Sequence, residues 1–304
     1  MFALRSLLAL TLIGGAAATL PAQAPKGVKL SVPGGWITYY ERGPRQGTPL
    51  ILVSGGPGFG SEYFWFRGWG GFEASHRNVR YDQRGTGAAS PVGPNDKVSV
   101  AQFVADIEAL RLALKAERID LLGHSWGGYL SMAYAAKHAN RLSHLILLDA
   151  AAPKFSDTRF LFNEAFPDRG DFLGQFSRGV ESGGATLDSA LVSYVSSIFY
   201  APENATAFLK QLGDAHFSRF QHKQLSREMG ATDLSPAIKG LKVKTLVISG
   251  RYDMNVAPST AFKIHQMIPG SDFVIFEKSS HMPFYEEGQK FGTVLRNFLA
   301  RSAP

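Results

Sequence analysis

The sequence of 304 residues contains no cysteine. This absence excludes disulfide bonds, a thiolate nucleophile and the lipid-modified cysteine that anchors a bacterial lipoprotein. The fold must therefore be stabilised by its hydrophobic core alone. With 45% hydrophobic and 19% charged residues, the composition suits one globular domain with room for an inserted subdomain.

A long apolar run is also missing. The most apolar stretch, residues 7–20, is about 14 residues long and contains two glycines, whereas a membrane-spanning helix needs about 20 apolar residues. One basic residue precedes the stretch and Ala22-Gln23-Ala24 follows it, which is typical of a secretory signal peptide over residues 1–24. We therefore expect a secreted or periplasmic protein with no stable membrane insertion after signal removal. Cleavage after Ala18 and a retained anchor stay open as alternatives.

The sequence also lacks clusters of basic residues and the residue spacings typical of metal sites. The net charge is +7, but lysine and arginine are scattered and form no basic stripe, which argues against nucleic-acid binding. The histidines show none of the spacings typical of metal sites, and we expect neither a metal nor a cofactor. Apart from one histidine treated below, we interpret them as structural or solvated: His76, His124, His138, His144, His216, His222 and His265.

Short apolar runs recur along the chain with helical patterns between them. Residues 28–32 and 36–41, separated by Pro33-Gly34-Gly35, indicate an antiparallel hairpin. Later runs are continuous, as in strands buried on both faces of a parallel sheet, and cover residues 49–53, 78–81, 119–122, 145–148, 245–248 and 273–276. Helical patterns cover residues 99–115, 126–138 and 286–300, and the first of them opens with the capping box Ser99-x-x-Gln102. The alternation predicts an α/β fold with a mostly parallel central sheet flanked by helices.

The alternation of strand and helix patterns is interrupted over residues 154–240, which carry helical patterns but no buried strand run. We interpret this stretch as a helical cap inserted into a core made of residues 25–153 and 241–304. Its aromatic residues suit either packing against the core or the lining of an apolar pocket, and both uses stay open. They are Phe155, Phe160, Phe162, Phe166, Phe172 and Phe176.

The pattern Gly123-x-Ser125-x-Gly127 lies between a predicted strand and a predicted helix. This is the context of a nucleophile elbow, a sharp turn that pushes a serine out above a sheet. Small residues at positions 123 and 127 let the backbone pass close to itself. The pattern therefore predicts Ser125 as a nucleophile.

A serine hydroxyl needs a base to take its proton, and the base needs a third group to orient it. On folds with this elbow, an acid and then a histidine follow the serine along the chain. Asp253 and His281 each come just after a buried strand run, so we predict Asp253 as the acid and His281 as the general base. Asp149, at the end of an earlier strand run, is the alternative acid.

An oxyanion hole is the remaining requirement for acyl transfer. The amide of Trp126, directly after the nucleophile, is one expected donor. The glycine-rich segment Ser54-Gly-Gly-Pro-Gly58 follows a buried strand and is expected to supply the other, from Gly56. The same segment fits a phosphate-binding loop badly because Pro57 has no amide hydrogen to donate.

The glycine-rich segments together resemble the proline iminopeptidase family of α/β hydrolases. The motifs that carry the resemblance are Ser54-Gly-Gly-Pro-Gly58, Tyr81-Asp-Gln-Arg-Gly-Thr-Gly87 and Gly123-His-Ser-Trp-Gly127, continued by Gly250-Arg-Tyr-Asp-Met254 and Ser280-His281. The resemblance implies an α/β-hydrolase fold, an acyl-enzyme on Ser125 and release of N-terminal residues from short peptides. Two positions depart from the family pattern, which has histidine in place of Ser54 and, in some members, an acidic residue in place of Met254.

The resemblance also implies carboxylates, largely from the cap, that hold the free α-amino group of a substrate. The candidates are Glu164, Glu181, Glu203 and Glu228, of which Glu228 is favoured. We expect Asp82 and Arg84 to hold the loop beneath the site through polar contacts.

These observations leave functions of different classes open. The first is an exported aminopeptidase that takes N-terminal proline or a similar small residue, and the second is a carboxylesterase or lactonase with the same triad. An aminopeptidase must neutralise a buried ammonium group with a carboxylate, whereas an esterase gains nothing from one. The third is a binding protein without catalysis, against which the complete set of serine, acid, histidine and oxyanion loop counts.

Overall fold

The structure of the protein, a computed structural model, describes residues 25–212 and 217–301. The predicted signal peptide over residues 1–24 lies outside the described residues. Within these described ranges, no helix has the length and apolar character needed to cross a membrane.

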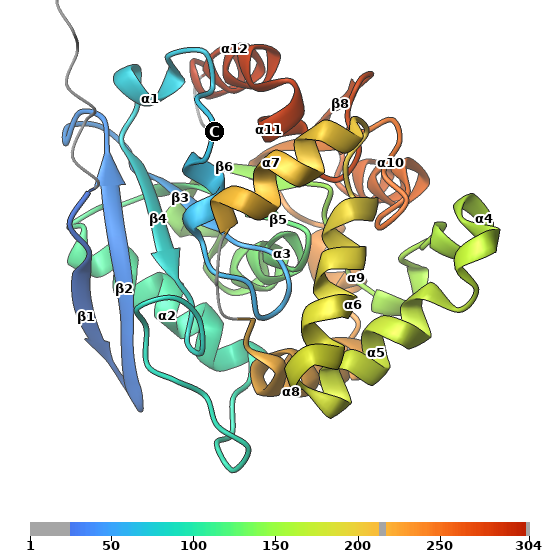
Figure 1. Ribbon diagram of the computed structural model, residues 1–304. Helices are drawn as coiled ribbons and strands as arrows, with labels where there is room; N and C mark the ends of the chain where they lie inside the picture. The colour runs from blue at the N-terminus through green and yellow to red at the C-terminus, as the bar shows by residue number, and fades with distance from the viewer. Residues whose placement is uncertain (1–24, 213–216, 302–304) are drawn as a thin grey trace, which may run out of the picture.

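Eight strands form one sheet in the order β1-β2-β4-β3-β5-β6-β7-β8 (Figure 1). The antiparallel edge consists of β1 (Val28–Val32), β2 (Gly35–Arg42) and β4 (Asn78–Asp82). The other pairs are parallel and involve β3 (Leu50–Val53), β5 (Ile119–His124), β6 (Leu142–Leu148), β7 (Lys244–Gly250) and β8 (Asp272–Phe276). The predicted hairpin and the predicted mostly parallel α/β sheet are confirmed.

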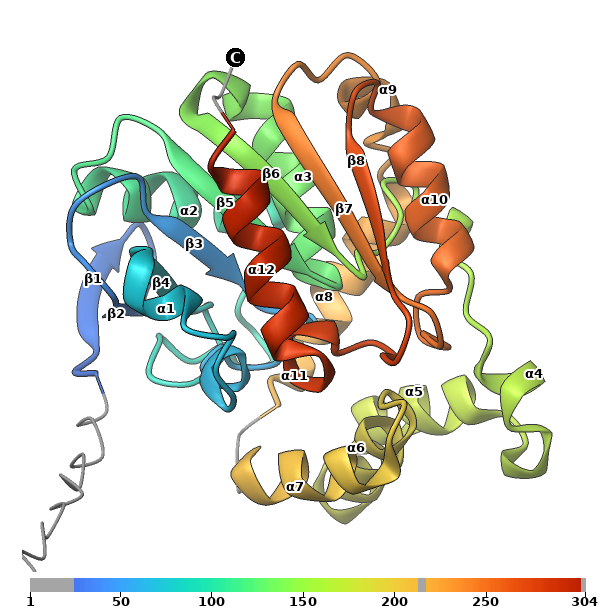
Figure 2. The same ribbon diagram turned by 90° about the horizontal axis from the view of Figure 1, so that it is seen from above.

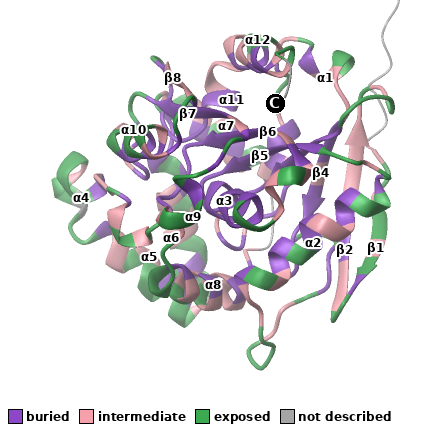
Figure 3. Cartoon of the chain, turned by 180° about the vertical axis from the view of Figure 1, so that it is seen from behind, coloured by how far each residue is buried: buried purple, intermediate pink, exposed green. Residues whose placement is uncertain are grey.

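The central strands are mostly apolar because both faces of the sheet are covered. Leu121 and Val247 enter the core on one face, while Leu122 and Ile248 enter a second core on the other face. Successive side chains of a strand point to opposite faces, so a strand between two cores carries apolar residues at successive positions and not only at alternate ones. Figure 3 shows β5 and β6 buried and β1 largely exposed at the edge.

Helices cover both faces of the sheet. The first core is completed by α2 (Val100–Ala113), α3 (Trp126–His138) and α10 (Pro258–Met267). The second is completed by α1 (Phe72–Ser75), α11 (Pro283–Glu286) and α12 (Gly288–Leu299). As predicted, Ser99 caps the start of α2, where its side chain accepts a hydrogen bond from the Gln102 amide at 3.3 Å.

Between β6 and β7 the described chain forms helices and one isolated bridge, Lys154 to Asp233, but no strand. The helices are α4 (Phe162–Ala165), α5 (Phe172–Ser182), α6 (Gly184–Ser197), α7 (Pro202–Leu212), α8 (Arg219–Ala231) and α9 (Ser235–Ile238). Figure 2 shows α4 to α7 beyond the carboxyl ends of the parallel strands. Ligands of open α/β sheets bind at this end.

Candidate active site

Ser125 occupies the turn between β5 and α3 with φ 57° and ψ −119°. A residue with a side chain rarely adopts a positive φ, and such strain persists only where the surroundings enforce it. Here the turn is tight on both sides: a Cβ on Gly123 would collide with the Gly127 carbonyl oxygen, and one on Gly127 would collide with that of Val53. The glycine pattern thus has the geometry of the predicted elbow.

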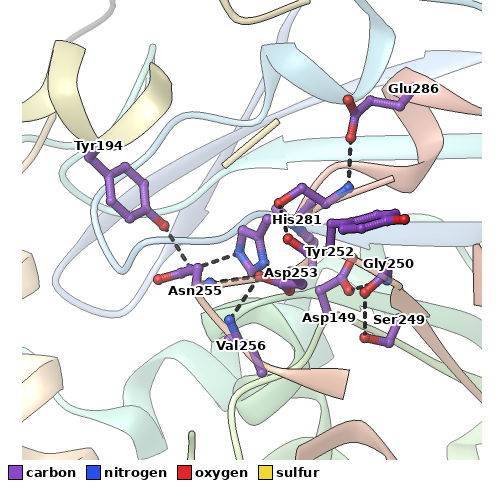
Figure 4. Close-up of polar contacts among 12 residues, drawn as sticks. Asp149, Tyr194, Ser249, Gly250, Tyr252, Asp253, Asn255, Val256, His281 and Glu286 are labelled. Atoms are coloured by element: carbon purple, nitrogen blue, oxygen red, sulfur yellow. Dashed lines mark hydrogen bonds and ion pairs between the residues drawn. The ribbon is translucent and has the colours of Figure 1, made fainter. Parts of the chain in front are cut away.

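His281 and Asp253 form a buried pair in which Nδ1 of the imidazole lies 2.7 Å from Oδ2 of the carboxylate (Figure 4). The other oxygen, Oδ1, accepts hydrogen bonds from the backbone amides of Asn255 and Val256, each at 2.8 Å. A carboxylate surrounded by donors can only accept, so Nδ1 carries the hydrogen and Nε2 is left as the acceptor. Ser125 and His281 line one small cavity of about 30 Å³.

The side-chain amide of Asn255 is hydrogen-bonded to the accepting nitrogen of this histidine. Its Nδ2 lies 3.0 Å from Nε2 of His281 and 2.9 Å from the hydroxyl oxygen of Tyr194 in α6 (Figure 4). Within the described residues, no hydrogen bond joins Oγ of Ser125 to His281. Sequence reasoning missed Asn255 because no motif marks an asparagine two positions after the acid.

Asp149, the alternative acid, lies at the end of β6 and is not bonded to His281. Its Oδ1 accepts a hydrogen bond from the Gly250 amide at 2.9 Å, whereas its buried Oδ2 has no hydrogen-bond partner among the described residues. Burial raises the pKa of Asp149 well above its ordinary value, and the neighbouring Asp253 charge raises it further. The geometry therefore favours Asp253 as the partner of the histidine.

The glycine-rich loop presents the expected oxyanion donor beside the serine. Because the Gly55 amide donates to the Tyr63 hydroxyl at 2.6 Å, Gly56 is the next residue of the loop with an amide to offer. Gly56 has φ +117°, and a Cβ there would lie 2.5 Å from the Gly58 nitrogen, so only glycine fits. Both Gly56 and Trp126, the first residue of α3, line a cavity that reaches Ser125.

A buried chain of hydrogen bonds links this loop to the histidine loop. The Tyr63 hydroxyl lies 2.9 Å from Nδ1 of His124, and Nε2 of His124 lies 2.9 Å from the His281 carbonyl oxygen. Burial lowers the pKa of His124 well below its ordinary value, so the ring is neutral and donates from Nε2 alone. His124, which we expected to be structural or solvated, is therefore structural and buried next to the site.

The cavity at Ser125 has a volume of about 310 Å³ and a mainly apolar lining. Side chains of the cap supply most of that lining, including Phe155, Phe160, Leu173, Phe176, Phe217 and Met229. Other cap aromatics pack instead into the core, where the rings of Phe162 and Phe172 lie 4.4 Å apart. Among the described residues, no carboxylate lines this cavity or the smaller one.

The structure does not bring Glu228, the favoured amine-binding residue, to the cavity. Its Oε2 accepts a hydrogen bond from the Val100 amide at 2.8 Å, because the first turn of α2 leaves amides without helical partners. Glu164 and Glu181 are exposed and paired with basic side chains, and Glu203 is exposed. In the described structure Glu228 joins the cap to α2 and is not among the residues that line either cavity at Ser125.

Asp82 and Arg84 hold the loop that follows β4. The Arg84 guanidinium makes two hydrogen bonds, of 2.6 and 2.8 Å, to the buried Asp106 carboxylate. Asp82 accepts hydrogen bonds from the Ser61 hydroxyl at 2.7 Å and from the Ala88 amide at 2.9 Å. Both side chains lie where the sequence suggested, in the scaffold.

One group of side chains in the described ranges has the spacing of a metal site. Ligand atoms of His124, Asp149 and His281 lie within 4.8 Å of one another. The two ring nitrogens of each histidine, however, already face protein hydrogen-bond partners. A metal ligand needs a free lone pair, so this arrangement does not suit a metal ion.

Comparison with known proteins agrees with this fold. The model of the α/β hydrolase fold family matches residues 48–288. A probable proline iminopeptidase from Leptolyngbya boryana is 28% identical over 279 residues, which cover 81% of this chain and 84% of that protein. A proline iminopeptidase from Lactiplantibacillus plantarum is 28% identical over 283 residues, which cover 88% of this chain and 98% of that protein.

Solved structures with the same fold include hydrolases of esters. The enol-lactonase from Burkholderia xenovorans LB400 has a TM-score of 0.73 and 26% identity, covering 90% of this chain and 100% of that one. An esterase from Exiguobacterium antarcticum has a TM-score of 0.73 and 24% identity, covering 91% of this chain and 100% of that one. At 24% identity, the similarity to the esterase from Exiguobacterium antarcticum shows a shared fold only.

Proposed function

Because the chain belongs to the α/β-hydrolase family and is a hydrolase, we propose that it works through an acyl-enzyme on Ser125, with His281 as general base and Asp253 as the orienting acid. The strained turn at Ser125 and the 2.7 Å contact between His281 and Asp253 support these roles. The sequence order of the three residues is that of the fold.

The proposed reaction has two halves. Oγ of Ser125 attacks the substrate carbonyl carbon while Nε2 of His281 takes the hydroxyl proton, and the amides of Gly56 and Trp126 stabilise the oxyanion. His281 then gives that proton to the leaving group as the bond to it breaks. Water repeats the attack on the acyl-enzyme with His281 as base, which releases the acid and restores Ser125. One oxyanion donor contributes about 3 kcal/mol to such a transition state.

The substrate class follows from the cavity. We infer that the protein hydrolyses carboxylic esters or lactones whose acyl part is apolar and uncharged. The single observation that carries this inference is an apolar cavity at Ser125 with no carboxylate among its described lining residues. A substrate ammonium group buried there would lack a counter-charge, which costs several kcal/mol.

Release of N-terminal residues is the second candidate. Relatives called proline iminopeptidases, at 28% identity over most of this chain, support it. It requires a carboxylate near the α-amino group of the substrate, which the described cavity residues do not supply.

A comparison of substrates tests the proposal. The purified protein is assayed with a p-nitrophenyl ester of an apolar acid and with a prolyl arylamide. Ser125→Ala is the blank, and Ser226→Ala, which removes another hydroxyl from the same cavity lining, is the matched control. We expect ester hydrolysis that Ser125→Ala abolishes and Ser226→Ala retains, with little arylamide turnover. Ser125-dependent arylamide cleavage that is lost when the α-amino group is acetylated would instead establish the aminopeptidase.

We also propose that the protein is exported, on the strength of the signal-peptide pattern in residues 1–24. N-terminal sequencing of the protein recovered from periplasm or medium is expected to begin after Ala18 or Ala24. Recovery of the uncleaved chain in the cytoplasm would contradict export.

A further inference from the structure

The hydrogen bond between Asn255 and His281 conflicts with the first step of catalysis. An imidazole nitrogen without hydrogen has one lone pair and accepts one hydrogen bond in the ring plane. Nδ2 of Asn255 lies 3.0 Å from Nε2 and uses that lone pair. The Ser125 hydroxyl needs the same lone pair to give up its proton, so the two contacts exclude each other.

The position of Asn255 explains why the larger cavity stops short of the base. That cavity is lined by Ser125 and Asn255 but not by His281. Among the described lining residues, Asn255 rather than His281 faces a ligand in this cavity, whereas Ser125 and His281 share the small cavity of about 30 Å³. Asn255 is only 7% exposed, and its backbone amide is held by Asp253 independently of its side chain.

The second hydrogen of the amide ties this contact to the cap. It is donated to the hydroxyl of Tyr194 at 2.9 Å. The Tyr194 ring lies 5.1 Å from that of Phe176 and 6.3 Å from that of Phe59, and all three side chains line the cavity. A ligand that fills the cavity therefore presses on the residues that hold Asn255 in place.

We propose that Asn255 and Tyr194 form a catch on the general base, closed while the cavity is empty and opened when an apolar acyl group fills it. Asn255 is a positioning residue in this arrangement, because it acts through His281. The catch makes hydrolysis selective for acyl groups large enough to displace it. This inference rests on the proposed function, since it takes Ser125 as the nucleophile and His281 as the base.

The rate at which a small methyl-substituted fluorophosphonate labels Ser125 tests the catch directly, because this probe does not fill the cavity. We expect Asn255→Ala to label about fivefold faster than the unaltered protein, the equivalent of one net hydrogen bond. Tyr194→Phe removes only the outer contact and is expected to give a smaller increase. Tyr200→Phe, which alters an exposed tyrosine of the cap, is the matched control and is expected to change nothing.

The ratio of kcat/KM between a large and a small ester provides a second test, because general damage to the fold would not change this ratio in the expected direction. In Asn255→Ala, we expect kcat/KM for an acetyl ester to rise about fivefold, because this small substrate no longer meets a blocked base. The value for a phenylacetyl ester should stay the same, so the ratio of phenylacetyl to acetyl kcat/KM should fall about fivefold. Damage to the fold would lower both values and would not speed labelling.

Labelling of Asn255→Ala no faster than that of the unaltered protein would overturn the catch. If Asn255→Ala does not fold, an unchanged labelling rate in Tyr194→Phe would overturn it in the same way. Failure of the proposed function looks different: Ser125 would be labelled but no ester would be hydrolysed, and the labelling rates would still decide the catch.

Discussion

Removal of one buried hydroxyl, by Tyr63→Phe, tests the link between the oxyanion loop and the histidine loop. The hydroxyl accepts a hydrogen bond from the Gly55 amide at 2.6 Å and donates to Nδ1 of His124 at 2.9 Å. Burial raises the pKa of Tyr63, which keeps this hydroxyl protonated and able to donate. Phenylalanine leaves both partners buried and unpaired, at a cost of about 1–3 kcal/mol each.

The free energy of unfolding is therefore expected to fall by about 2–6 kcal/mol in Tyr63→Phe. For a chain of this size that corresponds to a decrease in Tm of roughly 3–10 °C. Because Gly55 precedes the proposed oxyanion donor Gly56, we also expect kcat to fall about tenfold with little change in KM.

Urea unfolding and ester kinetics measure the two effects. Tyr200→Phe is the control, since the side chain of Tyr200 is 45% exposed and its hydroxyl can bond to water in both states. An unfolding free energy within about 0.5 kcal/mol of the unaltered protein, together with unchanged kcat, would refute the reasoning, because it would mean that the hydroxyl neither pairs the Gly55 amide nor positions the loop.

Three further substitutions test buried carboxyl groups. Asp106→Asn leaves the Arg84 guanidinium without a counter-charge and should lower the unfolding free energy in urea by about 3–5 kcal/mol, whereas Glu277→Gln, in an exposed ion pair, should have no measurable effect. Burial raises the pKa of Asp149, so the stability from this group is complete below the unfolded pKa and is lost as pH rises through the folded pKa. Asp149→Asn cannot ionise and should become progressively more stable than the unaltered protein as the pH of urea unfolding rises above about 4, the pKa of an unfolded aspartate, with hydrolysis retained. Asp253→Asn should lose kcat by a factor on the order of 10⁴ in the ester assay, and the opposite order of activities would make Asp149 the acid.

The fold was predictable where local patterns and long-range packing agree. Ile119, Leu121 and Leu122 are apolar because their side chains enter the two cores, and this short apolar run indicates a doubly covered strand. The cap of α2 was predictable because Ser99 and Gln102 interact across one turn. The helix predicted over residues 286–300 was less accurate: α12 begins at Gly288, after the separate short helix α11.

That difference has a tertiary cause. The Glu286 carboxylate accepts hydrogen bonds from the amides of Tyr200 and Ala201 in the cap and from that of Ser280 beside the histidine. These contacts hold the end of α11 in place, where the backbone then bends at Glu287. No periodicity within residues 286–300 records partners that lie more than eighty positions away.

Some residues of the candidate site were likewise predictable from the sequence, whereas others depend on contacts between distant parts of the chain. Ser125, Asp253 and His281 each follow a parallel strand, and the carboxyl ends of neighbouring parallel strands meet at one edge of a sheet, so their chain order was enough to predict them together. Glu228 and Asn255 depend instead on how the cap docks. Glu228 bonds to a residue 128 positions away and Asn255 to one 61 positions away. An acidic side chain on a cap helix is equally compatible with a cavity and with the amides at the start of α2, and only the packed structure decides between them. Substrate selection is therefore the part of the function that the chain order of the site leaves open, because the side chains that select the substrate come from the cap.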